Sequence, residues 1–185
     1  MVKLLHIFLG GITILVLGWL FWLNLVPGGD VTYVQDFKHR NPFISDLWPP
    51  EALQPVEKNG RPFIKDEVTF FIRPPREFER AQLQMYMEHS DKLKPELLIQ
   101  TEPGKEAWQA ISWQSILPDS GGALRVYQAT FVLDSQWRNP QKRYTMKVRV
   151  PGLQKTGTAA KMQKMSVRFV SPRVTLGDFW ELLRR

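Results

Sequence analysis

An uninterrupted apolar segment near the N-terminus constrains this chain most, because it divides the sequence into two chemically different parts. Leu4 to Val26 spans 23 residues without a lysine, arginine, aspartate or glutamate. An α-helix rises about 1.5 Å per residue, so about 20 apolar residues cross the hydrocarbon core of a bilayer. In lipid the backbone must also satisfy its own hydrogen bonds. The sequence therefore predicts one transmembrane helix within residues 1–27, with residues 4–26 in contact with lipid.

The alternative interpretation of this segment is a cleaved signal peptide. The apolar core of such a peptide usually runs about 7–15 residues and ends at small residues. Here the apolar run is longer, and the bulky stretch from Trp22 to Val26 occupies the place of cleavage. We interpret the segment as a retained signal anchor. Because long domains translocate largely regardless of flanking charge, the rest of the chain is expected on the extracytoplasmic side.

Two glycines in the apolar segment are candidates for packing between transmembrane helices. Gly11 and Gly18 lie seven residues apart and therefore on one face of a helix. Small residues on such a face let a second helix approach closely. Glycine is also simply common in membrane helices, and that is the simpler interpretation.

Residues 28–66 form a proline-punctuated segment that also carries many aromatic side chains. Flexible linkers are polar, and this segment is not. We therefore predict an extended stalk whose apolar side chains dock on the following domain or on a neighbouring protein. The prolines and aromatics are Pro42, Pro49, Pro50, Pro55, Pro62, Tyr33, Phe37, Phe43, Trp48 and Phe63.

From residue 67 onward the apolar residues alternate with a period of two, which is typical of half-buried strands. The alternation is clearest over 68–72, 80–87 and 143–150, whereas Ala107 to Ile116 forms a strand with imperfect alternation. Glycine and proline separate these short strands, and the chain lacks the helical crossovers that parallel sheets need. The prediction is an all-β fold, an antiparallel β-sandwich of jelly-roll type over residues 67–172.

The C-terminal residues 173–185 have the spacing of a short amphipathic helix. Apolar side chains at i, i+3, i+4 and i+7 share one helix face. A helix this short is marginal alone, so that face must dock on something. Packing on the sandwich is the simpler interpretation, and docking on the membrane surface or on a partner is the alternative. The residues of the face are Leu176, Phe179, Trp180 and Leu183.

No catalytic, metal-binding or nucleotide-binding motif is recognisable in the sequence. His39 and His89 are the only histidines outside the apolar segment, and neither has a second histidine at zinc-site spacing. Phosphate-binding glycine loops and nucleophile elbows do not occur. The carboxylate pairs at 66–67 and at 77 and 79 suit solvated strand ends. We therefore predict no enzymatic activity and no cofactor.

The formal net charge of +7 is concentrated in one region, because ten basic residues and no acidic residue lie between Asp134 and Asp178. Five of them occupy the outward positions of two predicted strands. If those strands are neighbours, they form a positive face for anionic lipid, acidic glycan or an acidic protein; the alternative is a solvated face. Nucleic acid is less favoured, because interleaved exposed aromatics are missing. The five residues are Arg143, Lys147, Arg149, Lys164 and Arg168.

Anchor, proline-rich segment and sandwich together resemble the single-pass envelope proteins of bacteria. The stretch Phe63 to Met87, with Pro74-Pro75 before Phe78, is similar to jelly-roll modules in such proteins. The resemblance implies a fold and an envelope location but no site residues. The expected function is a membrane-anchored binding module. The alternatives are an accessory subunit of a multi-subunit membrane complex and, less favoured, a hydrolase of envelope polymers.

Overall fold

The computed structural model describes residues 8, 10–19, 29–90, 93–116 and 124–170. The chain divides into two compact units, and the larger runs from Asp30 to Pro172. Outside it, residues 8 and 10–19 are helical, and a Cβ added at Gly11 or Gly18 would meet no atom within 4 Å. Among the described residues, no helix combines the length and apolarity needed to cross a membrane. The predicted C-terminal helix face at residues 176–183 lies outside the described residues.

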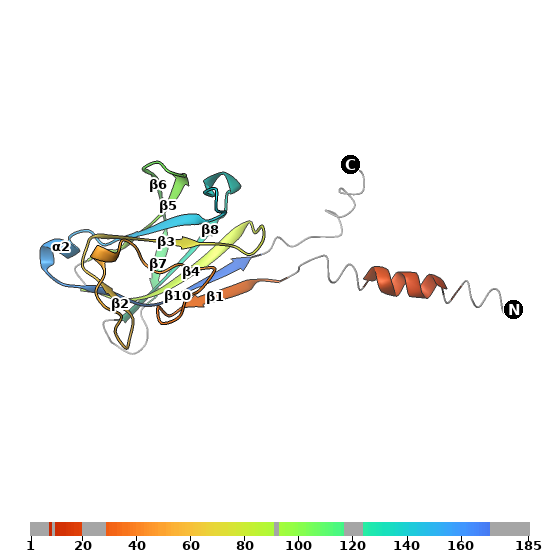
Figure 1. Cartoon of the computed structure of the whole chain (residues 1–185), viewed down its shortest axis with the longest axis horizontal. Coiled ribbons are helices and arrows are strands. Elements are labelled where there is room, and N and C mark those ends of the chain that lie inside the picture. The colour runs from red at the N-terminus through yellow and green to blue at the C-terminus, as the bar shows by residue number, and fades with distance from the viewer. Residues whose placement is uncertain (1–7, 9, 20–28, 91–92, 117–123, 171–185) are drawn as a thin grey trace. The chain divides into compact units, whose positions relative to one another are not determined.

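The larger unit is a β-sandwich of two antiparallel sheets, as the alternating pattern predicts (Figure 1). A six-stranded sheet has the order β1-β10-β4-β8-β7, with β2 also paired to β10, and a four-stranded sheet has the order β3-β9-β5-β6. The strands are β1 (Val31–Gln35), β2 (Arg61–Phe63), β3 (Glu67–Ile72), β4 (Arg80–Glu88), β5 (Glu96–Glu102), β6 (Ala107–Ile111), β7 (Trp113–Ile116), β8 (Leu124–Val132), β9 (Tyr144–Arg149) and β10 (Ala160–Val170). The short helices are η1 (Pro50–Ala52), η2 (Ser135–Trp137) and α2 (Leu153–Thr156).

The core lies between the two sheets and is built from the inward positions of the alternating strands. In β3 the residues Val68, Phe70 and Ile72 are fully buried, and in β4 every second residue from Ala81 to Met87 is buried. Because side chains alternate across a strand, each strand gives one face to this core. The outward faces carry most of the polar residues.

The predicted strand from Ala107 to Ile116 is two strands in two different sheets. β6 pairs with β5 in the four-stranded sheet, whereas β7 pairs with β8 in the six-stranded sheet. The chain crosses from one sheet to the other at Ser112. Both strands lie at the edges of their sheets and none of their residues is fully buried, which accounts for the imperfect alternation.

The segment predicted as a stalk, residues 28–66, belongs largely to the sandwich. β1 and β2 both pair with β10, and Ile44 and Trp48 form bridges to β3. Phe37, Ile44 and Phe63 are buried in the core. The sandwich therefore begins near Asp30 rather than at residue 67, because its first strands pair with the last strand of the domain.

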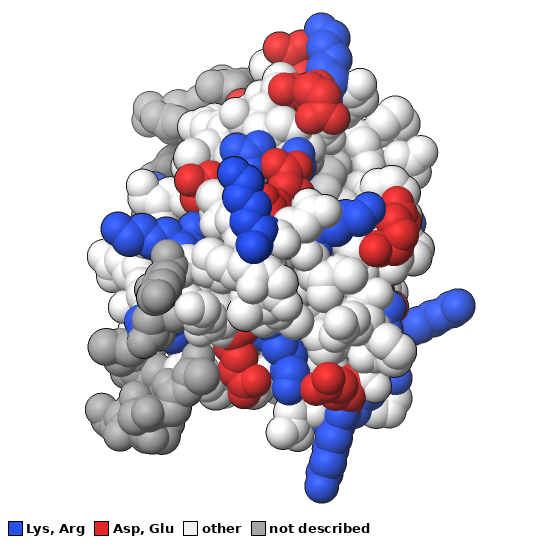
Figure 2. Space-filling view, turned by 90° about the vertical axis from the view of Figure 1, so that its left-hand side faces the viewer, with Lys and Arg blue, Asp and Glu red and all other residues white. Residues whose placement is uncertain are grey.

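The two ends of the sandwich differ in what they carry. At the Val31 end, β1 begins opposite Phe169 of β10, and β4 begins opposite Val170. At the opposite end, named here the α2 end, β10 begins beside β2 and the α2 turn follows β9. Figure 2 shows the α2 end, where basic and acidic side chains lie interleaved.

Candidate functional site

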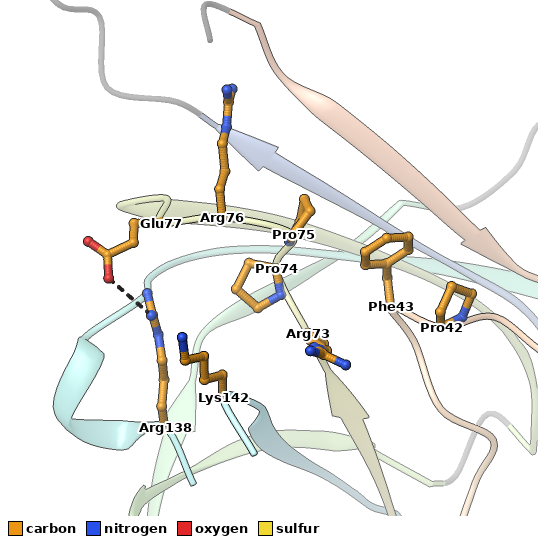
Figure 3. Close-up of a pocket in the computed structure, with 9 residues that line it drawn as sticks. All are labelled: Pro42, Phe43, Arg73, Pro74, Pro75, Arg76, Glu77, Arg138 and Lys142. Atoms are coloured by element: carbon orange, nitrogen blue, oxygen red, sulfur yellow. Dashed lines mark hydrogen bonds and ion pairs between the residues drawn. The ribbon is translucent and has the colours of Figure 1, made fainter. Parts of the chain in front are cut away.

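A hollow of about 550 Å³ opens at the Val31 end of the sandwich, where β3 ends and β4 begins. It is called here the arginine hollow. Basic side chains outnumber acidic ones in its lining, with apolar rings between them (Figure 3). The lining residues are Pro42, Phe43, Arg73, Pro74, Pro75, Arg76, Glu77, Arg138 and Lys142.

One wall of the hollow is the crossover between the two sheets, residues 73–79. β3 ends at Ile72 because the prolines at 74 and 75 have no backbone N–H to donate to a ladder. The N–H of Arg73 still donates to the carbonyl of Phe43 at 2.8 Å, and that of Leu133 donates to Glu79 at 2.7 Å. These bonds fix both ends of the crossover. They set the positions from which Arg73, Arg76 and Glu77 project.

The other wall is the turn after η2, which presents Arg138 and Lys142. The Asn139 side-chain oxygen accepts hydrogen bonds from the N–H groups of Gln141 at 3.1 Å and Arg143 at 3.0 Å. Lys142 has a φ of 58°, in the left-handed region that costs a non-glycine residue about 1–2 kcal/mol. The turn therefore keeps a lysine where a glycine would be less strained.

Arg138 is held in place by two neighbouring side chains. Its Nε donates to the Tyr144 hydroxyl at 2.9 Å, and its Nη1 lies 3.3 Å from the Glu77 carboxylate. The hydrogen bond to Tyr144 raises the pKa of Arg138, although partial burial opposes the shift. Burial in turn raises the pKa of Tyr144, against the lowering effect of Arg138. Arg138 is thus a permanent cation and Tyr144 a neutral phenol.

Arg73 and Lys142 are exposed, and within the described part of the chain neither makes an ion pair. Figure 3 shows Lys142 and Arg138 coming from the η2 turn and Arg73 from the crossover, while Arg76 at the rim extends away from them. The Arg76 guanidinium lies 4.8 Å from the centre of the Phe78 ring. Four cations, with Arg76 at the rim, thus border the hollow together with one carboxylate, which Arg138 already engages.

The five residues predicted to form one positive sheet face do not share a face, so this prediction is wrong. β9 and β10 belong to different sheets. Lys147 is 7% exposed and pairs with Glu67 at 2.9 Å, and Arg149 pairs with the same carboxylate at 2.6 Å.

The remaining members are scattered as well. Arg168 pairs with Asp30 at 2.5 Å, and Lys164 lies 5.5 Å from the centre of the Tyr86 ring. Arg143 is exposed and precedes β9. Alternation along a strand indicates which side chains face outward, but it does not indicate which strands share a sheet.

Sequence reasoning missed Arg73 and Arg76, because both lie outside the basic stretch between residues 134 and 178. The available clue is their position around two prolines, Arg73-Pro74-Pro75-Arg76. Prolines end a strand, so basic residues on both sides of them are placed at an end of the sandwich.

Comparisons with known proteins carry no argument about the function of this chain. Neither a family model nor a curated protein matches the chain. Among solved structures, a carbohydrate-binding module from a study of specific mannan recognition is similar, with a TM-score of 0.40 and 13% identity. The match covers 78% of this chain and 100% of that one. A similarity at this level does not extend to a binding site.

Proposed function

We propose that this chain is a non-enzymatic binding module, tethered to a bilayer by residues 4–26, that holds an anionic group in the arginine hollow. The observation that carries the proposal is that Arg73, Arg138 and Lys142 line one concavity whose lining contains a single carboxylate. Isolated unpaired lysines on a surface are ordinary, and Lys155 is one of them. Three cations from two separate segments around one hollow are not.

The chemistry of these side chains favours an oxyanion. A guanidinium presents a planar fork of donors that matches carboxylate, sulfate or phosphate, and a lysine ammonium adds a mobile point charge. Arg138 is already oriented by Tyr144 and Glu77, so little of its freedom is lost on binding. The volume of about 550 Å³ falls within the range of ordinary ligand sites.

The backbone of Lys142 supports the same conclusion. Left-handed non-glycine residues are costly and concentrate at functional sites. Here the strained residue carries one of the two cations of the hollow that lack an acidic partner. A requirement for the charged side chain gives a reason for lysine at a position whose backbone favours glycine.

Binding fits the hollow better than catalysis. Its lining offers no histidine, serine or threonine. Its carboxylate, Glu77, is ion-paired with Arg138. Across the described residues no group of three or more histidine or acidic side chains could hold a metal ion. General acid–base catalysis needs a proton-transferring side chain within reach of the reacting atoms, whereas the lining supplies mainly arginine and lysine.

Titration of the full-length protein in detergent with pyrophosphate tests the proposal. The double variant Arg73→Ala, Lys142→Gly should weaken binding at least about tenfold, because two charge-assisted contacts are lost. The matched control is Lys155→Ala, which removes an exposed lysine from α2 at the opposite end. Wild-type affinity in the double variant, or an equal loss in the control, contradicts the proposal.

A further inference from the structure

We infer that the anion taken by the arginine hollow is the phosphate group of a lipid in the same bilayer that holds residues 4–26. The inference rests on the proposed function and names its ligand. Three features carry it: the short connection from the apolar segment to the Val31 end, the aromatic side chains between that connection and the hollow, and the mixed lining of the hollow.

The connection limits how far the Val31 end can lie from the apolar segment. That segment ends at Val26, and β1 begins five residues later at Val31. An extended chain covers at most about 3.5 Å per residue, so a connection of this length reaches at most about 18 Å. The hollow lies at this end of the sandwich and not at the α2 end.

Stacked rings link the hollow to the strands that carry the connection. Phe43, in the hollow lining, stacks on Tyr33 of β1 with ring centres 3.9 Å apart. Phe78 stacks on Phe169 of β10 at 5.3 Å, and Arg76 lies over the Phe78 ring. Since Tyr33 and Phe169 are also in edge contact, Phe43 of the lining and the crossover wall both pack onto the pair of strands at the Val31 end.

The lining suits the surface of a bilayer better than it suits a free anion. Pro42, Phe43 and Pro75 place apolar rings beside the cations, and apolar groups next to lysine and arginine are typical of surfaces that enter the headgroup region. A small free anion at an open site must compete with water. A lipid in the same bilayer is present at high effective concentration, so that even weak individual contacts are occupied.

The α2 end shows what a surface without this role looks like. There Lys161 lies 2.8 Å from Glu57 and 3.6 Å from Glu88, and Arg149 is paired with Glu67. Basic and acidic side chains are interleaved across that end (Figure 2). Paired charges give no net attraction to an anionic surface, whereas Arg73 and Lys142 of the hollow make no ion pair among the described residues.

The test uses the full chain in nanodiscs of phosphatidylcholine, with or without phosphatidylglycerol. The chain has no cysteine, so single cysteines can be labelled with a fluorophore at exposed positions. Gln141→Cys lies beside Lys142, and Lys155→Cys in α2 is the matched control at the other end. A headgroup-quencher lipid should quench the probe at 141 at least about threefold more than the probe at 155.

The hollow itself is tested by adding Arg73→Ala and Lys142→Gly to each labelled chain. In discs that contain phosphatidylglycerol these changes should lower the quenching at 141 to the level found at 155. Equal quenching at both positions, or quenching at 141 that the changes leave intact, overturns the inference.

Pyrophosphate titration of the same discs separates the two proposals. If pyrophosphate binds through Arg73 and Lys142 but headgroup quenching ignores them, the lipid inference fails and the proposed function stands. If neither measurement depends on the two residues, both fail. If alkaline carbonate releases the chain from vesicles, residues 4–26 do not anchor it in the bilayer, and the lipid inference fails.

Discussion

Two groups of cations, one at each end of the sandwich, differ in their acidic partners. At the α2 end Lys147, Arg149 and Lys161 each lie within 3 Å of a glutamate. At the Val31 end Arg73 and Lys142 border a hollow in which Glu77 is the only acidic residue. Net charge alone therefore does not locate a binding surface. What matters is whether the fold already supplies the counter-charge.

Burial explains much of the difference. Lys147 is 7% exposed, and a buried ammonium without a carboxylate would be strongly destabilising. The cations of the hollow that lack a partner are exposed, so water solvates them at little cost. The ion pairs of the α2 end therefore support the fold, whereas the hollow retains charge that a ligand can use.

The largest expected effect concerns the tight packing at the α2 end. Gly60 has a φ of +135°, and a Cβ there would lie 2.5 Å from the carbonyl oxygen of Met162 on β10. Overpacking and backbone strain together predict that Gly60→Ala lowers the free energy of unfolding by about 3 kcal/mol. Gly104→Ala is the control, because Gly104 (φ +81°) faces open space and should lose only about 1 kcal/mol. Urea unfolding that gives equal losses contradicts the close approach.

Removing a carboxylate from each end compares the ion pairs directly. Glu67→Gln should cost about 1–2 kcal/mol, since it leaves the nearly buried Lys147 without its nearest partner. Glu77→Gln should cost less than about 0.5 kcal/mol, because the Glu77 side chain is 89% exposed. Thermal unfolding of both variants checks this ranking of stability losses. A larger loss for Glu77→Gln than for Glu67→Gln would contradict the view that the ion pairs of the α2 end support the fold more than that of the hollow.

Acid should remove the contribution of Glu67. Partial burial raises its pKa, but hydrogen bonds and charges from Lys147 and Arg149 outweigh burial and hold the pKa below its ordinary value of 4.5. A carboxyl with a lowered pKa stabilises the fold above its unfolded-state pKa, and the contribution is lost as pH falls through the folded-state pKa. The stability difference between wild type and Glu67→Gln should therefore shrink below pH 4.5. A constant difference from pH 7 to pH 3 would exclude this linkage.

The smallest effect is expected at the hollow, and with the opposite sign. Lys142→Gly relieves a left-handed backbone and should raise the free energy of unfolding by up to about 0.5 kcal/mol, although it weakens anion binding. Lys142→Ala keeps the strain and removes the same charge. If both variants are equally stable, the backbone of Lys142 holds no strain, and one support for a functional lysine is lost.

The parts of the fold that follow from local alternation are predictable from the sequence. The buried faces of β3 and β4 are the apolar positions that the period-two pattern identifies. The placement of residues 30–66 is not predictable in this way. β1 pairs with β10 from the opposite end of the domain, and nothing local in Val31–Gln35 indicates that partner.

Predicting the site from the sequence would have required the same kind of long-range information. Lysines and arginines of β9 and β10 are recognisable as outward-facing residues, but these strands belong to different sheets and most of the five cations have other partners. The hollow arises where the crossover at 73–79 meets the turn that carries Arg138 and Lys142. These two segments, about sixty residues apart in sequence, build it together with Pro42 and Phe43.

The pairing of β1 with β10 also sets how the domain responds to mechanical load. Val31 and Phe169 are opposite each other at the same end of the ladder, so a force between the chain before Val31 and the chain after Val170 acts on one hydrogen-bonded pair at a time. In an antiparallel ladder loaded from one end the bonds break in sequence, as in a zipper. Peeling β1 would draw Tyr33 away from Phe43. A force of this kind would therefore break the Tyr33–Phe43 stack beside the hollow, while Phe43 stays bonded to Arg73.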